Sequence, residues 1–108
     1  MLLLEGFKHF KTATNGLAAL EYMISCRATH EQLPILMILD LHMPCMDGFE
    51  ACDYLRKLNF TLPICALSAA VDLDTRTRCH QLGFSYVLTK PITQLDLTTV
   101  LRQLILSQ

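Results

Sequence analysis

Residues 35–39 are apolar at every position. Side chains of a strand alternate between the two faces of its sheet, so a run without polar residues predicts a strand that is buried on both faces. Strands of this kind are typical of a parallel sheet with helices packed against both sides. The segment therefore predicts an α/β fold in which residues 35–39 form an interior strand.

Strand-like and helical patterns alternate along the rest of the chain. Further strands are predicted at residues 7–13, 62–67 and 84–88, and the first of these has the mixed polarity of an edge strand. Asn15 and Asp47 are predicted to cap helices, a third helix should run from Leu73 to Leu82 before Gly83, and Thr93 with Asp96 resembles a capping box. A loop is predicted at residues 26–33.

Each of these helices has apolar residues at helical spacing, which should face the core. They are Leu17, Leu20 and Ile24 in the first helix, Phe49, Cys52, Leu55 and Leu58 in the second, and Leu97, Val100, Leu101 and Leu104 in the last.

Composition favours one packed domain, residues 1–108, because 52% of the residues are apolar and only 18% are charged. The net charge of -1, without a basic run, argues against nucleic-acid binding by this domain alone. The sequence contains no stretch of 18 or more apolar residues, so it predicts no membrane span.

The cysteines point to a reducing compartment. They number five and include no C-x-x-C pair, so we expect reduced core residues and a cytoplasmic protein. A zinc or redox site built on His42 and Cys45, or on Cys79 and His80, is the alternative, but a second matching ligand pair is missing from the sequence.

Three polar residues follow three successive predicted strands. Asp40 and Ser68 come directly after theirs, and Lys90 comes just past the last strand. Parallel strands deliver their carboxyl ends to one edge of the sheet, so these side chains should converge. An aspartate can accept a phosphoryl group as a nucleophile, a serine hydroxyl can donate to a phosphoryl oxygen, and an ammonium group can neutralise the charge that develops. Hydrolysis by Ser68 is disfavoured because no G-x-S-x-G motif surrounds it.

Longer motifs make a family resemblance specific. They are DLHMPCMDGFEA at residues 40–51, ALSA at 66–69, LGFSYVLTKPI at 82–92 and ATNGLAALE at 13–21. With these motifs the chain resembles the receiver domain of response regulators, which has a flavodoxin-like parallel sheet with helices on both faces. The resemblance implies that Asp40 accepts a phosphoryl group from a histidine kinase or phosphotransfer protein, that Ser68 is the switch hydroxyl, and that Lys90 contacts the phosphate. It also implies a cis bond before Pro91.

The resemblance further implies a magnesium ion held by Asp40 and the backbone carbonyl of His42. Family members begin with a central strand that ends in two adjacent acidic residues, followed by a helix. This chain lacks that opening, because residues 1–16 resemble the end of the first helix and the second strand. We therefore expect weak magnesium binding and slow or absent phosphorylation by this chain alone. Val87, with Tyr86 beside it, stands where the family often has a switching aromatic residue.

Loss of a central strand would leave neighbouring strands with unpaired edges. Three remedies are open: the 7–13 strand pairs directly with the 35–39 strand, a partner chain fills the gap by dimer formation or strand exchange, or the sequence is a fragment.

The functional expectation is a phosphoacceptor receiver domain in a two-component phosphorelay, not an enzyme, acting alone or at the end of a hybrid kinase. The alternative is a phosphorylation-independent pseudo-receiver that binds partner proteins through the face formed by its last strand and helices.

Overall fold

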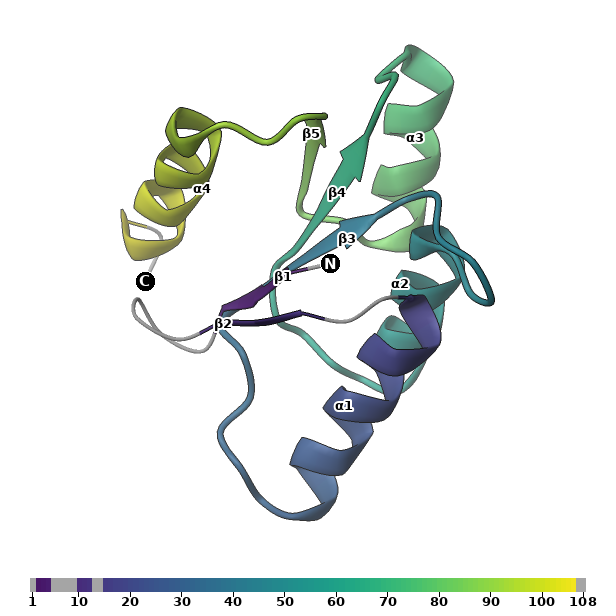
Figure 1. The fold of residues 1–108 in the computed structure, drawn as a ribbon, viewed down its shortest axis with the longest axis vertical. Coiled ribbons are helices and arrows are strands. Elements are labelled where there is room, and N and C mark those ends of the chain that lie inside the picture. The colour runs from purple at the N-terminus through teal and green to yellow at the C-terminus, as the bar shows by residue number, and fades with distance from the viewer. Residues whose placement is uncertain (1, 5–9, 13–14, 107–108) are drawn as a thin grey trace.

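A computed structural model of the chain describes residues 2–4, 10–12 and 15–106 (Figure 1). Within these residues the strands are β1 (Leu2–Leu4), β2 (Phe10–Thr12), β3 (Leu36–Asp40), β4 (Ile64–Ser68) and β5 (Tyr86–Thr89). The helices are α1 (Gly16–Ala28), α2 (Gly48–Lys57), α3 (Leu73–Leu82) and α4 (Gln94–Leu106). None of the described helices is long and apolar enough to cross a membrane.

The strands form one sheet with the order β2-β1-β3-β4-β5. Strands β3, β4 and β5 are parallel, with Asp40 opposite Leu67 and Ser68 opposite Thr89. Their carboxyl ends therefore meet at one edge, as the sequence predicted. The predicted edge strand is confirmed for Phe10–Thr12, which lies at the end of the sheet.

The place between β2 and β3 is filled by β1, which the sequence pattern did not predict. Leu2 lies opposite Ile38 and Leu4 opposite Leu36, so β1 is antiparallel to β3, and it is also antiparallel to β2. Of the three remedies left open by the sequence, direct pairing of the 7–13 strand with β3 is therefore excluded for the described strand Phe10–Thr12. The reason is that β1 supplies the backbone hydrogen bonds that the apolar edge of β3 would otherwise lack. Three residues are too few to show a strand period in the sequence.

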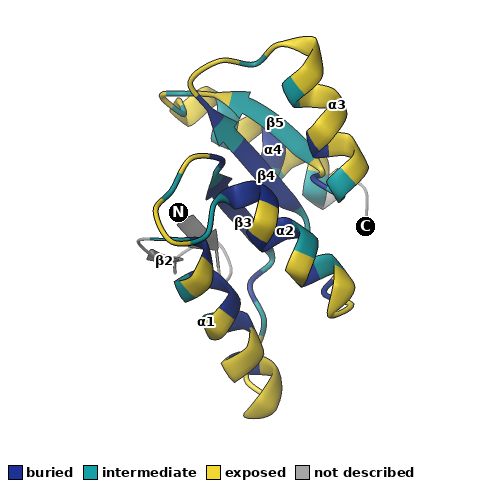
Figure 2. Ribbon diagram, turned by 90° about the vertical axis from the view of Figure 1, so that its right-hand side faces the viewer, coloured by how far each residue is buried: buried dark blue, intermediate teal, exposed yellow. Residues whose placement is uncertain are grey.

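The two-sided burial predicted for residues 35–39 is confirmed, because β3 alternates between two apolar clusters. Met37 and Leu39 face α1, α2 and α3, while Leu36 and Ile38 face α4. Figure 1 shows the same division, with α4 on the opposite side of the sheet from the other helices. In Figure 2 the buried positions of the helices lie toward the sheet and the exposed positions away from it.

The buried face of α1 agrees only in part with the one predicted. Leu20 is buried as predicted, whereas Leu17 and Ile24 are exposed; the buried residues are Gly16, Ala19, Leu20, Met23 and Cys26. Both sets have helical spacing, so spacing alone does not distinguish them. Gly16 decides the matter: a Cβ atom there would lie 2.5 Å from the carbonyl oxygen of Met46, so this position must face the loop before α2.

Two further boundaries differ from the sequence interpretation. Cys26 is a buried residue of α1 and not the start of a loop, because the helix continues to Ala28. Leu58 is an exposed C-cap residue beyond α2 and does not reach the core.

The predicted helix ends are otherwise confirmed. The side chains of Asn15 and Asp47 accept hydrogen bonds from Ala18 N and Glu50 N, and Gly83 ends α3 in the left-handed conformation, with φ of 98°. In the capping box, Asp96 N donates to Thr93 Oγ1 at 3.0 Å and Thr93 N donates to Asp96 Oδ2 at 3.2 Å. These local signals could be found in the sequence because each needs only residues three or four apart.

The core position expected for the cysteines is confirmed for four of them and wrong for Cys45. Cys26, Cys52, Cys65 and Cys79 are buried, whereas Cys45 is exposed in the loop after β3. None of the five forms a disulfide bond.

Candidate functional site

The site lies where β3, β4 and β5 end, and backbone hydrogen bonds tie these ends together. Leu41 N donates to Leu67 O at 3.0 Å, and Lys90 N donates to Ser68 O at 2.7 Å. The residues that leave the three strands are thus held side by side at one edge of the sheet.

The carboxylate of Asp40 is the centre of this edge, and both of its oxygens have a donor. Its Oδ2 forms an ion pair with Lys90 Nζ, and its Oδ1 accepts a hydrogen bond from His42 N at 2.9 Å. The side chains of Lys90 and Asp40 are 35% and 24% exposed, so solvent reaches both. The predicted convergence is therefore seen directly for Asp40 and Lys90.

Burial alone would raise the pKa of the Asp40 carboxyl group, but its surroundings more than reverse this effect. The hydrogen bonds from Lys90 and from the His42 backbone, together with the positive charges of Lys90 and His42, hold the pKa below the ordinary value of 3.8. Asp40 is consequently an anion at neutral pH. A carboxylate anion is the form that a nucleophile requires.

Ser68 ends β4 next to this pair, but its hydroxyl group has other partners. Ser68 is only 2% exposed; its Oγ donates to Ala70 O at 2.8 Å and accepts from Ala70 N at 3.3 Å. The hydroxyl is thus satisfied within its own turn. The sequence placed Ser68 at the correct strand end but did not indicate the direction of its side chain.

The loop after β3 depends on two close backbone approaches. A Cβ atom on Gly48 would lie 2.5 Å from Asp40 O, and Gly48 N donates to Leu41 O at 3.3 Å. At the far side of the loop, Gly16 N donates to Met46 O at 2.9 Å. These two glycines hold the loop between β3 and α1. Nothing in the sequence indicated the role of Gly16, because it depends on a residue thirty positions away.

The His42 side chain is exposed in this loop. Lys90 and Pro91 are joined by a cis peptide bond, as the family resemblance implied. Val87 packs against the cluster shared with α1, α2 and α3, while Tyr86 packs against the α4 cluster. The two neighbouring residues of β5 therefore face opposite sides of the sheet.

The residues around Asp40 do not fit the magnesium site that the resemblance implied. Magnesium favours several oxygen ligands, usually carboxylates together with phosphate oxygens. Among the described residues no group of three or more His, Cys, Asp or Glu side chains is placed to hold a metal ion. Strand β1, beside β3, consists of leucines and runs in the opposite direction. Glu5 lies outside the described residues.

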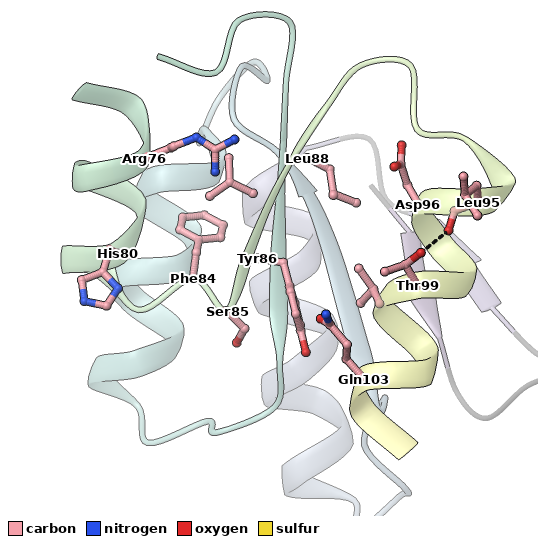
Figure 3. Close-up of a pocket in the computed structure, with 12 residues that line it drawn as sticks. Arg76, His80, Phe84, Ser85, Tyr86, Leu88, Leu95, Asp96, Thr99 and Gln103 are labelled. Carbon is pink, nitrogen blue, oxygen red and sulfur yellow. Dashed lines mark hydrogen bonds between the residues drawn. The ribbon is translucent and has the colours of Figure 1, made fainter. Parts of the chain in front are cut away.

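A groove of about 550 Å³ lies on another face, along β5 and between α3 and α4 (Figure 3). Arg76 and His80 line it from α3, and Asp96 and Gln103 line it from α4. Tyr86 rises from β5 beside Gln103. This groove coincides with the face on which the pseudo-receiver alternative places its partner.

A sheet whose strands β3, β4 and β5 are parallel, with helices on both faces and polar residues gathered where these strands end, places the chain in the class of flavodoxin-like proteins. Within this class, a family model for the response regulator receiver domain matches residues 1–102. The chain belongs to the family of response regulator receiver domains.

Characterised relatives include whole regulators and kinases. The chain is 32% identical over 104 residues to the transcriptional regulatory protein PrrA of Mycobacterium tuberculosis, and the match covers 96% of this chain and 42% of PrrA. It is 34% identical over 93 residues to the sensor histidine kinase CheAY of Helicobacter pylori, covering 84% of this chain and 11% of that protein. The chain thus corresponds to less than half the length of either relative.

Solved structures support the same fold. The receiver domain of the Francisella response regulator 1452 has a TM-score of 0.73 at 26% identity, and the match covers 87% of this chain and 73% of that domain. The chemotaxis protein CheY4 of Vibrio cholerae has a TM-score of 0.71 at 27% identity, covering 87% of this chain and 75% of that protein.

Proposed function

We propose that residues 1–108 are a phosphoacceptor receiver domain of a two-component phosphorelay and that Asp40 accepts the phosphoryl group. The observation that carries this proposal is the ion pair of Asp40 with Lys90 at the edge where β3, β4 and β5 end. It places an anionic nucleophile next to a cation able to stabilise the charge on a transferred phosphoryl group.

The donor in this proposal is a phosphohistidine of a histidine kinase or phosphotransfer protein. A carboxylate oxygen of Asp40 attacks the phosphorus atom, a P–O bond forms, and the P–N bond breaks with its electron pair left on the donor imidazole. The product is an aspartyl phosphate. The chain turns over no substrate of its own and is not an enzyme in this proposal.

Lys90 and Ser68 have successive roles. The Lys90 ammonium group moves from Asp40 Oδ2 to an oxygen of the bound phosphoryl group, where it offsets the added negative charge. The Ser68 hydroxyl must leave Ala70 O, to which it donates at 2.8 Å, before it can donate to a phosphoryl oxygen. This rearrangement couples phosphorylation to the turn at residues 68–70.

The cellular setting follows from the same proposal. The presence of a sensor histidine kinase among the relatives supports a kinase or phosphotransfer protein as the partner. Because the relatives include both a regulator and a kinase, the domain could belong to a separate regulator or to a hybrid kinase. We place the protein in the cytoplasm, where phosphorelay partners and reduced thiols are found. Because the net charge of -1 offers no bulk attraction to nucleic acid, the proposal includes no nucleic-acid partner for this domain alone.

Incubation with a small phosphodonor such as phosphoramidate, followed by intact-mass measurement, tests this function. Wild type and Asp53→Asn, which alters a carboxylate on α2, should gain one phosphoryl group, whereas Asp40→Asn should gain none. Absence of an adduct on wild type after prolonged incubation, with cooperative unfolding demonstrated on the same sample, would contradict the proposal. That result would favour the pseudo-receiver, whose partner would then be sought at the groove between α3 and α4.

A further inference from the structure

An apolar strip on the surface belongs neither to the Asp40 site nor to the groove between α3 and α4. It lies along the line where α1 packs against α2, and its members are partly exposed: Leu17 (42%), Ile24 (45%), Tyr54 (49%) and Leu58 (38%). We propose that this seam strip is the interface of a two-fold symmetric homodimer, in which the α1–α2 pair of one copy lies antiparallel to that of the other. The proposal does not rest on phosphoryl acceptance.

Contacts at both ends of the two helices place the seam. At the N-terminal end, a Cβ atom on Gly16 would lie 3.0 Å from the Cβ atom of Ala51. At the C-terminal end, Arg27 Nη1 donates a hydrogen bond to Leu58 O at 2.6 Å. Helices α1 and α2 therefore run side by side and in the same direction on one face of the sheet (Figure 1).

Residue spacing then directs the strip toward this seam. Side chains three, four or seven positions apart share a face of a helix. The faces that carry the seam contacts consist of Leu17, Leu20, Ile24 and Arg27 on α1, and of Ala51, Tyr54 and Leu58 on α2. Leu20 is buried at 8% exposure, whereas the four members of the seam strip remain open to solvent.

The grouping of these side chains is what requires an explanation. Seven large apolar side chains are exposed among the described residues, and four of them form the seam strip. The other three, Leu73, Leu95 and Leu106, lie on α3 and α4. Single exposed apolar residues are ordinary in monomeric proteins, but a group of them on one surface is typical of an interaction site.

The charges beside the strip favour a second copy of this chain as the occupant. The carboxylates of Asp47 and Glu50 lie at the N-terminal end of the seam, whereas the cations Arg27 and Lys57 lie at its C-terminal end. Lys57 pairs with Asp53 at 2.9 Å but is 68% exposed, so its ammonium group is open to a further carboxylate. The surface is thus acidic at one end and basic at the other.

An antiparallel second copy brings each acidic end against a basic end, whereas a parallel copy would oppose like charges. A two-fold axis perpendicular to the seam produces this arrangement without further adjustment, because an isologous interface uses the same patch on both subunits. Stable interfaces bury about 800 Å² on each partner. Four partly exposed side chains form a small apolar centre, so we expect a weak dimer with a dissociation constant on the order of 100 μM.

Sedimentation velocity of the full chain tests the interface. The average mass of wild type should rise toward that of a dimer between about 10 μM and about 1 mM protein. Ile24→Glu and Tyr54→Glu, one on each helix, should remain monomeric over this range because they place a charge in the apolar centre. Leu73→Glu and Leu95→Glu are the matched controls, since these leucines are exposed outside the strip, and both should associate like wild type.

Wild type that stays monomeric over the whole range would overturn the proposal and would leave the strip to a different partner protein. Association that is lost in Leu95→Glu and retained in Ile24→Glu would also overturn it, because the contact would then lie at the groove between α3 and α4. Circular dichroism shows which variants are folded, and Leu17→Glu replaces either strip variant that is not.

Carbodiimide cross-linking tests the antiparallel orientation, because it joins carboxylates to amines that are in contact. A mixture of isotopically labelled and unlabelled protein distinguishes cross-links between copies from those within one copy. We expect Lys57 of one copy to be joined to Asp47 or Glu50 of the other. A dimer that yields no cross-link between copies at Lys57 would overturn this orientation.

Discussion

The guanidinium group of Arg56 donates two hydrogen bonds to the carbonyl oxygen of Gly83, from Nε at 3.0 Å and from Nη2 at 2.7 Å. Its Nη1 donates to Phe60 O at 2.9 Å and to Leu62 O at 2.8 Å. One side chain near the end of α2 thus links the segment that leads into β4 with the turn that leads into β5. Strand β4 ends at Ser68, and strand β5 ends directly before Lys90.

We predict that Arg56→Ala lowers the free energy of unfolding by about 2 kcal/mol or more, because three carbonyl groups lose a charged donor. Urea unfolding measures the change. Lys57→Ala is the matched control, since Lys57 is an exposed neighbour that pairs only with Asp53 in the described structure, and it should unfold like wild type. Equal behaviour of the two variants would show that the Arg56 network contributes nothing.

Gly83→Ala tests the same junction from the other side. Gly83 has φ of 98°, and an added Cβ atom would lie 3.0 Å from both Cγ and Nε of Arg56. Strain and contact together should lower stability by about 1–2 kcal/mol. Asn59→Gly is the contrasting variant. Asn59 has φ of 67°, and glycine adopts this conformation freely, so this substitution introduces no backbone strain. A Gly83→Ala protein as stable as wild type would contradict this account.

Gly48→Ala should disturb the loop that follows Asp40. The new Cβ atom would lie 2.5 Å from Asp40 O, a backbone atom, so the end of β3 must shift. We expect phosphoryl acceptance from a small donor to slow by roughly tenfold or more, because small displacements of a reacting group are costly. The rate is measured by intact mass at a temperature where both proteins are fully folded. An unchanged rate would mean that Asp40 tolerates the shift.

The ion pair between Asp40 and Lys90 predicts a dependence of stability on pH. Burial raises the pKa of Asp40, but its hydrogen bonds with Lys90 and His42 N lower it further than burial raises it, so the folded protein holds the carboxyl group below its ordinary pKa of 3.8. A group of this kind contributes stability that is present above its unfolded pKa and is lost as the pH falls through its folded pKa.

Wild type should therefore lose stability relative to Asp40→Asn as the pH falls below about 4. Denaturant unfolding at a series of pH values gives the difference between the two proteins. In the Lys90→Gln background the same comparison should depend much less on pH. A difference that stays constant from neutral pH into the acid range would argue against the ion pair in solution.

Thiol labelling distinguishes Cys45 from the other cysteines. Burial raises the pKa of Cys52 to about 11 and that of Cys65 to about 12, and it also raises the pKa of Cys79. Thiolates are the reactive form, so these buried groups should react slowly. Native protein treated with iodoacetamide should gain one label, at Cys45, whereas protein unfolded in urea should gain five. Peptide mapping identifies the site, and rapid labelling of Cys52 or Cys65 would contradict the buried core.

Much of the fold could be predicted because its signals are local. Two-sided burial of residues 36–39 follows from an unbroken apolar run, and the caps at Asn15, Asp47 and Gly83 depend on residues a few positions away. The meeting of Asp40 with Lys90 could also be anticipated, because parallel strands end at a common edge.

Other features depend on contacts between distant segments, and these the sequence left open. Leu17, Leu20 and Ile24 of α1 have helical spacing, but only Leu20 is buried, and the close approach of Gly16 to Met46 O accounts for the orientation of the helix. The direction of the Ser68 hydroxyl was also left open, although its acceptor, Ala70 O, is only two residues further along the chain.

By itself, then, the sequence determined the alternation of strands and helices, the ends of most helices, and the edge at which Asp40, Ser68 and Lys90 lie. Short-range periodicity and capping are sufficient for these features. Only the tertiary structure decided that β1 fills the gap beside β3 and that Leu17 and Ile24 of α1 face away from the core. Each of these outcomes depends on which distant groups satisfy a backbone edge or allow a close approach.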